Sequence, residues 1–456
     1  MLAPVPACSI VGPAAMPRPI ADSQRSSEQT EPWREAWFPV AFAIDLQADE
    51  VRRVSIFDRG YALFCDAAGH LACLLDRCPH RAARLSNGRL RAGRIECLYH
   101  GWQFDSTGRC LHIPQLAGDQ PIPASACATA VPLAVRQGLV WVYGGSRADP
   151  DAEAIPAVGQ VPWEECRSID FAIDLPYGQD FLIENVLDYA HIHIAHDGIR
   201  GGGHRDRARP LCFEVSDIGP AGFTARFGVD GQVDPHTLTG ATVEFAAPNL
   251  VHYRSLYRDP ARCSGLALYA LPLGSGRSRL LYRAYSNFAP WRDRIRPRFW
   301  EHGYQCHLLE QDMAVLMGQA EEIRRSGATP SAMWLPLKSS DTLVLGYRQW
   351  LDQYAAGRPD YIGFRGRGPG SGHAPHAGPV DRWTLHTSQC ASCRRALRIA
   401  RFAQHWLPPL AFALLALACV VPADGTWRYL LASSSLLTLA GSLVAGALCR
   451  RLLAPG

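Results

Sequence analysis

Two short stretches decide the fold: Cys78-Pro-His80 and, after sixteen further residues, Cys97-Leu-Tyr-His100. Each stretch offers one thiolate and one imidazole. A cluster of two irons that binds both thiolates at one iron and both imidazoles at the other needs such mixed pairs from two loops. The proline fixes its own φ and stiffens the first loop, and Gly101 lets the backbone of the second loop turn tightly.

We therefore predict that Cys78, His80, Cys97 and His100 bind a Rieske-type [2Fe–2S] cluster. Neutral imidazoles on one iron raise the potential of such a cluster to about −150 to +300 mV. A zinc site made of the same four residues is the alternative. Zinc fingers usually pair Cys with Cys and His with His, whereas each pair here mixes the two residue types, which favours two irons.

The loops lie within a region of short alternating runs that are typical of β-strands. Val54–Phe57 and Ala62–Phe64 are expected to be strands joined by a turn at Arg59-Gly60, and Leu139–Tyr143 closes the region. The sequence therefore predicts an all-β domain over residues 33–148.

A second group of metal-ligating residue types follows: Asp188, His191 and His196, with the spacing Asp-x2-His-x4-His. Two histidines and one carboxylate on one face of Fe(II) leave positions open for dioxygen and substrate. On an ideal helix the two histidines would be about 140° apart. We therefore expect the helix over Glu184–His196 to bend or end near His193-Ile194.

The carboxylate of this site must come from elsewhere in the chain. Asp312 is the first candidate and Glu310 the second, both on a long helix expected over residues 298–325, where apolar residues recur at helical spacing. His193 is a third histidine in the same segment and competes for the assignment. Two hydrogen-bonded core histidines and a solvated carboxylate are the alternative, which the upstream cluster motif disfavours.

Strands and helices are mixed in the region that carries this second motif. Strand-like runs are expected at residues 222–227, 242–245, 250–257 and 266–271. The fold class predicted is therefore α+β: an all-β Rieske domain, then a helix-grip-like mononuclear iron domain over residues 160–358, then a C-terminal helical hairpin.

A Gly-, Pro-, His- and Ser-rich stretch within residues 359–380 is expected to be a linker. The segment 381–400 follows and contains Cys390-Ala-Ser-Cys393, whose spacing suits a dithiol redox switch. Two unreactive thiols beside a membrane, or half of an intermolecular metal site, are the alternatives.

Two apolar segments, Trp406–Val421 and Tyr429–Leu448, end the chain. The second is long enough for the roughly 20 residues that a bilayer requires, and the first becomes so when it is extended back to Phe402. We predict a transmembrane hairpin over residues 402–449, with a buried soluble hairpin as the alternative. Arginines flank both outer ends, so the positive-inside rule places both ends in the cytoplasm or stroma.

Composition excludes several other classes of protein. The chain has 456 residues, 48% hydrophobic and 19% charged, which is too apolar for a disordered protein. A net charge of +4 without a basic stripe does not indicate nucleic-acid binding. Fifteen cysteines, an odd number, do not suit a secreted disulfide framework. Residues 1–32 lack a secretory signal and are expected to form a flexible tail.

The Cys/His pairs followed by Asn185-x2-Asp188-x2-His191-x4-His196 resemble the Rieske non-haem iron oxygenases. More narrowly, they resemble the pheophorbide a oxygenase branch, with chlorophyllide a oxygenase, protochlorophyllide-dependent translocon component 52 and the Tic55-type proteins. Further parts of the resemblance are Trp37–Val40, Glu310-Gln311-Asp312, Asp341-x5-Tyr347-Arg348-x-Trp350-Leu351 and His386-Thr387-x2-Cys390-x2-Cys393.

The resemblance implies a homotrimer in which electrons cross between subunits. It places Asp188, with Asn185 beside it, in the catalytic machinery, where Asp188 would bridge His100 of one subunit to His191 of the next. It also implies a [2Fe–2S] cluster, mononuclear Fe(II), O2, and electrons from ferredoxin or an NAD(P)H-dependent reductase. It further implies regulation by thioredoxin through Cys390 and Cys393.

The substrate implied is a chlorophyll-derived tetrapyrrole such as pheophorbide a or chlorophyllide a. The location implied is a thylakoid or other photosynthetic membrane, or a bacterial inner membrane, in contact with lipid. An aromatic-ring hydroxylase of the wider Rieske family is a second interpretation. A redox-sensing membrane component that turns over no substrate is a third, although such a protein would not need a mononuclear iron site.

Overall fold

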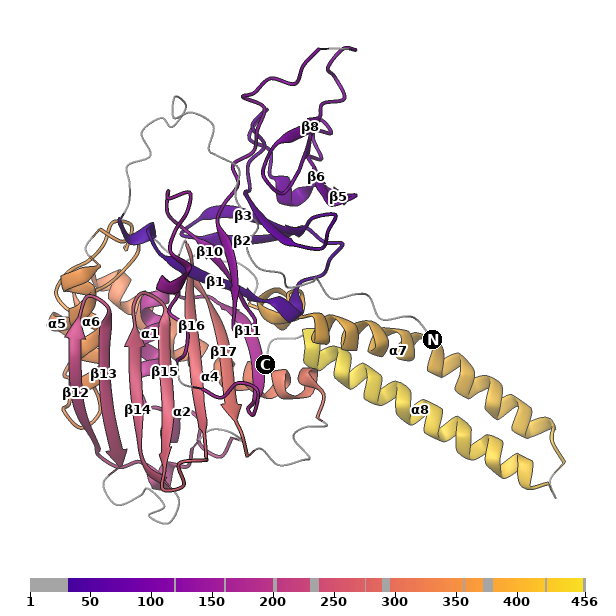
Figure 1. Ribbon diagram of the computed structural model, residues 1–456. Coiled ribbons are helices and arrows are strands. Elements are labelled where there is room, and N and C mark those ends of the chain that lie inside the picture. Colours follow the sequence, from indigo (N-terminus) through magenta and orange to yellow (C-terminus); the bar gives the residue numbers. More distant parts are fainter. Residues whose placement is uncertain are drawn as a thin grey trace. The chain divides into compact units, whose positions relative to one another are not determined.

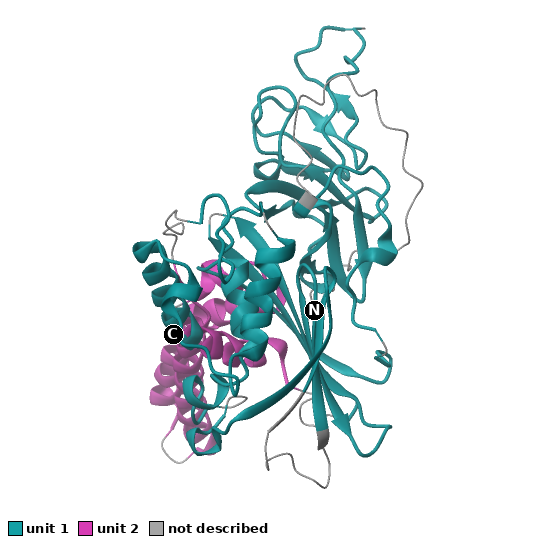
Figure 2. Ribbon diagram, turned by 90° about the vertical axis from the view of Figure 1, so that its left-hand side faces the viewer, with its two compact units in different colours: residues 1–294, 311–377 teal, residues 295–310, 378–456 magenta. Residues whose placement is uncertain are grey.

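The computed structural model describes residues 32–453 except 119, 160, 200–202, 230–237, 275, 289–295, 356, 372–379 and 423–424. The predicted tail, apart from its last residue, and part of the predicted linker lie outside the described residues. The chain divides into two compact units (Figure 2): residues 1–294 with 311–377 form unit 1, and residues 295–310 with 378–456 form unit 2.

The N-terminal part of unit 1 consists of three small antiparallel sheets. Their orders are β1-β10-β9, β2-β3-β4 and β5-β6-β7-β8 (Figure 1). The first Cys/His loop lies between β4 and β5, and the second lies between β6 and β7. The strands are β1 (Trp37–Phe42), β2 (Arg52–Ile56), β3 (Arg59–Cys65), β4 (Leu71–Leu75), β5 (Arg89–Arg91), β6 (Arg94–Glu96), β7 (Gln103–Phe104), β8 (Cys110–His112), β9 (Leu133–Arg136) and β10 (Leu139–Tyr143).

A seven-stranded antiparallel sheet forms the rest of the β-structure, in the order β11-β17-β16-β15-β14-β13-β12. Four of its strands contain the predicted runs. The strands are β11 (Arg167–Leu175), β12 (Leu211–Gly219), β13 (Gly222–Val229), β14 (Leu238–Ala246), β15 (Leu250–Tyr257), β16 (Ser264–Gly274) and β17 (Arg277–Ser286). The predicted α+β class is confirmed.

The turn between β2 and β3 lies at Phe57-Asp58, so the prediction of a turn at Arg59-Gly60 was wrong. Phe57 and Asp58 have φ of 48° and 64°, as a two-residue hairpin turn requires. Their N–H groups donate to the carbonyls of Pro272 (2.9 Å) and Leu273 (3.0 Å) on β16. Hydrogen bonds to a distant strand therefore fix this turn, which local sequence does not reveal.

The edge strand β11 and its neighbour β17 carry charged residues at paired positions. Arg279 binds both carboxylate oxygens of Asp174 (2.6 and 3.1 Å), and Arg283 binds both of Asp170 (2.7 and 2.8 Å). Arg279 also donates to the carbonyl of Val40 on β1 at 2.9 Å. Such bidentate pairs are stronger than neutral hydrogen bonds, and they link β11 to β17. The bond from Arg279 to Val40 joins the seven-stranded sheet to the N-terminal sheets.

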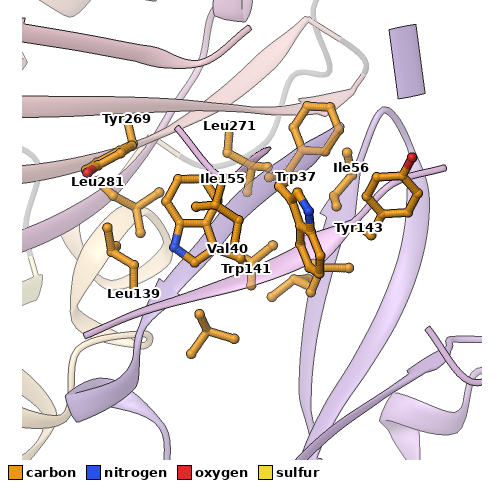
Figure 3. Close-up of a cluster of buried hydrophobic side chains, with 14 of the residues drawn as sticks. Trp37, Val40, Ile56, Leu139, Trp141, Tyr143, Ile155, Tyr269, Leu271 and Leu281 are labelled. Atoms are coloured by element: carbon orange, nitrogen blue, oxygen red, sulfur yellow. The ribbon is translucent and has the colours of Figure 1, made fainter. Parts of the chain in front are cut away.

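One hydrophobic core spans these two sets of sheets. Trp37 on β1 and Trp141 on β10 pack with Tyr269 on β16 and Leu281 on β17 (Figure 3). The Trp141 and Tyr269 rings meet edge to face with centroids 5.5 Å apart, a preferred arrangement of aromatic pairs. The Rieske-like part and the seven-stranded sheet therefore belong to the same compact unit.

Helices of unit 1 lie along the seven-stranded sheet. They are α1 (Gln179–Leu187), α2 (Ile192–Ala195), the later part of α4 (Arg298–Ser326), α5 (Pro330–Met333) and α6 (Thr342–Tyr354). Arg348 of α6 is fully buried and binds Asp180 (2.8 Å) and Glu184 (2.5 Å) of α1. Gln319 of α4 donates to Glu184 as well, at 3.1 Å. Arg348, which belongs to the Asp341-x5-Tyr347-Arg348-x-Trp350-Leu351 part of the resemblance, thus anchors α1.

Unit 2 contains the beginning of α4, a π-helical turn (Trp383–Thr387), α7 (Ala391–Val420) and α8 (Thr426–Leu453). The last two helices pack antiparallel. Ser435 Oγ donates to the Ala411 carbonyl at 2.7 Å, and a Cβ on Gly441 would come within 3.3 Å of Leu407. Small residues at such contacts let two helices approach closely.

Both α7 and α8 are long and apolar enough to cross a membrane. Only 11% and 22% of their most apolar windows are buried within the protein, so they do not resemble core helices of a soluble protein. Trp406 lies near one end of the apolar part, and Trp427 and Tyr429 at the other; all three side chains are exposed. Aromatic residues at both ends are typical of helices that meet two membrane interfaces.

Candidate metal centres

The two Cys/His loops adopt the same backbone conformation. In the first loop, the Cys78 carbonyl accepts from Ala82 N–H at 2.9 Å, and in the second the Cys97 carbonyl accepts from Gly101 N–H at 2.9 Å. Ala82 and Gly101 both have positive φ, 55° and 75°. A Cβ on Gly101 would lie 2.9 Å from the ring of Pro114, so a side chain there would be crowded as well as strained.

The two thiols of these loops are buried side by side. Cys78 and Cys97 are 2% and 1% exposed and belong to the core that also contains Phe64 and Phe104. Burial raises the pKa of Cys78 to about 11, and the Cys97 thiol beside it adds to this rise. Two buried thiolates need a cation between them, and a metal cluster supplies one.

The two imidazoles lie together at the surface edge of the same loops. The rings of His80 and His100 are 4.4 Å apart, and His80 stacks on Trp102 at 4.7 Å. These four side chains, all within the described part of the chain, do not bring three or more ligand atoms within 4.8 Å of one another. One zinc ion would need such a group. The wider arrangement fits the ligand set of a two-iron cluster, with its thiolates on one iron and its imidazoles on the other.

His191, His196 and Asp312 do form a compact group, with ligand atoms within 4.8 Å of one another. Asp312 Oδ1 lies 3.8 Å from His191 Nε2 and 3.4 Å from His196 Nε2. Metal bonds of about 2 Å require ligand atoms roughly 3 to 4 Å apart. The donor set, two imidazoles and one carboxylate, therefore fits one divalent metal ion of the 2-His-1-carboxylate kind.

The segment that carries the two histidines is not one helix. The expected bend near His193-Ile194 was placed wrongly: α1 ends at Leu187, and the chain leaves helical geometry at Asp188, whose ψ is 93°. His191 and His196 then flank the single turn of α2. The break before His191 reorients both rings, whose centroids are 5.3 Å apart.

The Nδ1 atoms of His191 and His196, which face away from Asp312, have different neighbours. His196 Nδ1 lies 3.0 Å from Gln311 Oε1, and His191 Nδ1 lies 3.5 Å from Asp188 Oδ2. Burial lowers the pKa of His196, but hydrogen bonds with Asp312 and Gln311 outweigh it and raise this pKa. Gln311 belongs to the Glu310-Gln311-Asp312 part of the resemblance, but the sequence does not identify it as a hydrogen-bond partner of His196.

Other residues considered from the sequence lie outside this group. Asn185 is buried on α1, and its backbone carbonyl accepts from Asp188 N–H at 3.2 Å. His193 is partly buried, and its Nδ1 accepts from His204 N–H at 3.3 Å. Glu310 is paired with Arg382 within unit 2, at 2.5 and 2.6 Å. The geometry therefore favours Asp312 over Glu310 as the third ligand.

Unit 2 contains a second compact group of ligand atoms: His302, His386, Cys390 and Cys393, all buried and all within 4.8 Å of one another. A hydrogen bond with Cys393 holds the pKa of Cys390 well below its ordinary value despite burial, and contacts with His302 and His386 act in the same direction. His302 had no place in the sequence prediction. The signal that could have found it is that His386, Cys390 and Cys393 make a three-ligand set that lacks a fourth.

Comparison with known families gives two matches. Residues 36–129 match the Rieske [2Fe-2S] domain, and residues 245–329 match the pheophorbide a oxygenase family. The first range includes both Cys/His loops, and the second includes Asp312.

Relatives match over most of the chain. Protein TIC 55 of Arabidopsis thaliana is 32% identical over 90% of this chain and 81% of its own length. Pheophorbide a oxygenase of Oryza sativa subsp. japonica is 29% identical over 94% of this chain and 87% of its own length. Flavonoid 8-hydroxylase 2 of Ocimum basilicum is 27% identical over 90% of this chain and 82% of its own length. All three are named as chloroplastic.

A solved structure shares the fold. The crystal structure of dicamba monooxygenase bound to dicamba has a TM-score of 0.57 and 23% sequence identity. It covers 70% of this chain and 97% of the other chain.

Proposed function

The chain belongs to the Rieske non-haem iron oxygenases, in the branch of Tic55 and pheophorbide a oxygenase, and from this premise we propose that it is a membrane-bound oxygenase of chlorophyll-derived tetrapyrroles. The observation that carries the oxygenase function is the compact triad of His191, His196 and Asp312 downstream of two Cys/His loops. An electron carrier needs only the Cys/His loops, whereas an oxygenase needs the loops and the triad.

In this proposal Cys78 and Cys97 hold one iron of the [2Fe–2S] cluster, and His80 and His100 hold the other. The triad holds the mononuclear iron. Bound there, Fe(II) with electrons from the cluster supplies the activation of O2 that no side chain can perform. The protein contributes ligand orientation, burial and the electron path.

Gln311 and Asp188 orient the ligands in this proposal. With His196 Nδ1 held by Gln311 and His191 Nδ1 facing Asp188, both Nε2 atoms turn towards Asp312. Partners of this kind fix the tautomer and ring orientation of metal-binding histidines. One oxygen of Asp188 is already fixed by Ala190 N–H at 2.9 Å, so its carboxylate has a defined direction.

The proposed electron path crosses a subunit boundary in a homotrimer. His80 is exposed and His100 is partly exposed at the edge of their loops, with Leu98 and Tyr99 69% and 57% exposed beside them. The Asp188 side chain is 30% exposed. A partner's imidazole could therefore reach Asp188 from solvent, and ferredoxin or a reductase could reach the loops in the same way.

A membrane hairpin suits this substrate class. A chlorin partitions into lipid, and α7 and α8 would hold the enzyme at that surface. Arginines precede α7's apolar part and end α8, so we propose that unit 1 and the outer helix ends lie on the cytoplasmic or stromal side. The chloroplastic relatives favour a photosynthetic membrane.

The substrate test uses the purified full chain with a ferredoxin-reducing system and 18O2. Pheophorbide a and chlorophyllide a are each supplied, and products are analysed by mass spectrometry. We expect 18O in a chlorin product with the parent and none with Asp312→Ala. Absence of both binding and 18O incorporation for every chlorin tested would reject the tetrapyrrole assignment.

A second candidate is an aromatic-ring hydroxylase acting on a smaller phenolic substrate. It is favoured by the flavonoid 8-hydroxylase, whose identity to this chain is within two percentage points of that of the pheophorbide a oxygenase. The same assay with a flavone separates the two candidates, because each predicts 18O in only one of the two substrate classes. A redox sensor without turnover would give 18O in neither.

A further inference from the structure

The ligand group in unit 2 has no part in the proposed oxygenase chemistry. We propose that Cys390, Cys393, His302 and His386 together bind one zinc ion in a closed structural site. This inference concerns a metal centre separate from the cluster and from the mononuclear iron, and it stands whether or not the substrate is a chlorin.

The four ligands come from three elements, two of them adjacent in the sequence and the third, α4, more than 80 residues earlier. His302 lies in the first turns of α4, and His386 lies in the π-helical turn. Cys390 is the N-cap residue of α7, and Cys393 lies in its first turn. The Cys-x-x-Cys spacing is that of one half of a zinc site, and short π-helical turns often mark functional positions. His386, just before this pair, and His302 of α4 supply the other half.

The distances between ligand atoms match a tetrahedral zinc site. His386 Nε2 lies 3.2 Å from Cys393 Sγ, and His302 Nδ1 lies 3.4 Å from Cys390 Sγ and 3.5 Å from Cys393 Sγ. Zinc bonds of about 2.3 Å to sulfur and 2.0 Å to nitrogen at tetrahedral angles place S and N about 3.5 Å apart. One ion can therefore be bound with shifts of a few tenths of an ångström.

Burial of the four residues agrees with a closed site. Cys390, Cys393, His302 and His386 are 4%, 0%, 1% and 2% exposed. Two thiolates and two neutral imidazoles balance the charge of Zn²⁺, so the occupied group carries no net charge. Uncompensated charges are costly to bury, which makes the divalent ion a suitable occupant of this core.

Surrounding hydrogen bonds hold the π-helical turn in place. Arg382, just before the turn, binds Glu310 of α4 with both arms of its guanidinium and donates to the Arg451 carbonyl at 2.7 Å. Thr387, next to His386, donates to the Leu452 carbonyl at 2.7 Å. These contacts attach the turn to α4 and to the end of α8 within unit 2. These hydrogen bonds therefore fix the position of His386 relative to α4.

The same geometry disfavours a simple dithiol switch. A switch needs two sulfurs and access for a reductant, whereas Cys390 and Cys393 are buried and each sulfur has an imidazole nitrogen within 3.5 Å. Nothing in disulfide exchange requires His302 on α4. A zinc site requires all four residues and explains why they converge.

The experiment measures zinc and iron in the full chain purified in detergent, together with zinc K-edge X-ray absorption. We expect about one zinc per chain, bound by two sulfurs near 2.3 Å and two nitrogens near 2.0 Å. The iron content serves as a separate readout of the oxygenase centres, so failure of either proposal is visible by itself.

Three variants make the assignment specific. The Cys390→Ser, Cys393→Ser double variant should lose nearly all its zinc, and His386→Cys should keep zinc with three sulfur ligands, a change that misfolding cannot produce. Cys306→Ala is the matched control, because Cys306 is a buried cysteine on α4 outside the group, and it should retain parental zinc. Zinc absent from the parent, other ligation, or equal zinc loss in the control would overturn the proposal.

Discussion

Among individual residues, Asp188 has the most demanding role in this account. One carboxylate oxygen accepts from Ala190 N–H, and the other lies 3.5 Å from His191 Nδ1. The first contact is the local hydrogen bond that many aspartates make after a helix. The second contact, together with partial exposure, suits a bridge from the triad to another subunit.

Asp188→Asn should keep all iron but slow electron transfer to the mononuclear site. The amide lacks the negative charge that orients and polarises His191, and loss of such partners typically costs about 10- to 100-fold. The measurement is the rate at which the pre-reduced cluster is reoxidised by O2 in the presence of substrate, followed by stopped-flow absorbance.

Asp197→Asn is the control for this variant. Asp197 follows His196 directly but accepts from Arg205 N–H at 2.9 Å and does not belong to the triad. Its reoxidation rate should equal that of the parent. A parental rate in Asp188→Asn would exclude Asp188 from the electron path.

The sequence names candidate ligand residues but not their partners. Metal-ligand spacing singles out Cys78 and His191 because the chemistry needs those residue types close in sequence. Gln311 and His302 act through contacts with residues more than 80 positions away. No local pattern marks such residues, since on a helix a glutamine or histidine is ordinary. Only the folded chain brings them to the sites.

Among the elements, α1 depends on a buried ion pair network. Arg348 is fully buried between Asp180 and Glu184 and also lies over the Phe181 ring at 4.8 Å. Burial raises the pKa of Glu184, although Arg348 opposes that rise. The network therefore fixes the helix that leads directly into Asp188 and the histidines.

Arg348→Met should destabilise unit 1 strongly. Removing one partner of a buried ion pair leaves uncompensated charge and costs about 3–5 kcal/mol. The measurement is the apparent melting temperature of the detergent-purified protein, together with retention of the mononuclear iron. Arg324→Met is the control, because Arg324 pairs with Glu321 on the surface of α4, and surface pairs contribute little. Equal melting temperatures for the two variants would contradict the role of Arg348.

Periodicity predicted the regular elements well and the irregular ones poorly. The long helix α4 and strand β15 lie within one residue of their predicted bounds, because their apolar patterns are long. Strands β11 and β17 were missed because Asp170 and Arg283 are charged residues that become buried only by pairing with each other. The helix break was misplaced because the chain leaves helical geometry at Asp188, which accepts from Ala190 N–H, and apolar periodicity does not reveal such a contact.

At the scale of the whole molecule, electron transfer between subunits predicts that two different inactive variants restore activity when they assemble together. Cys97→Ser chains lack a complete cluster site, and His191→Ala chains lack the triad. Neither should turn over substrate alone. Co-expressed, they should form mixed trimers with partial activity, because an intact cluster on one chain would face an intact triad on its neighbour. Assay of the doubly tagged, co-purified complex tests this.

An inactive mixed complex, with both chains present and each keeping its remaining metal, would show that electrons stay within one chain. A complex that is not trimeric by light scattering would also exclude the arrangement. The sequence alone could supply this expectation only through resemblance, since intersubunit contacts leave no local pattern.

Iron analysis with low-temperature EPR of the dithionite-reduced protein shows whether one chain holds two separate iron centres. We expect about three irons per chain and the EPR signal of a reduced Rieske cluster. His191→Ala should lose one iron and keep that signal, while His193→Ala should match the parent. Only two irons, unaffected by His191→Ala, or zinc in place of iron at the Cys/His loops, would contradict the presence of two iron centres.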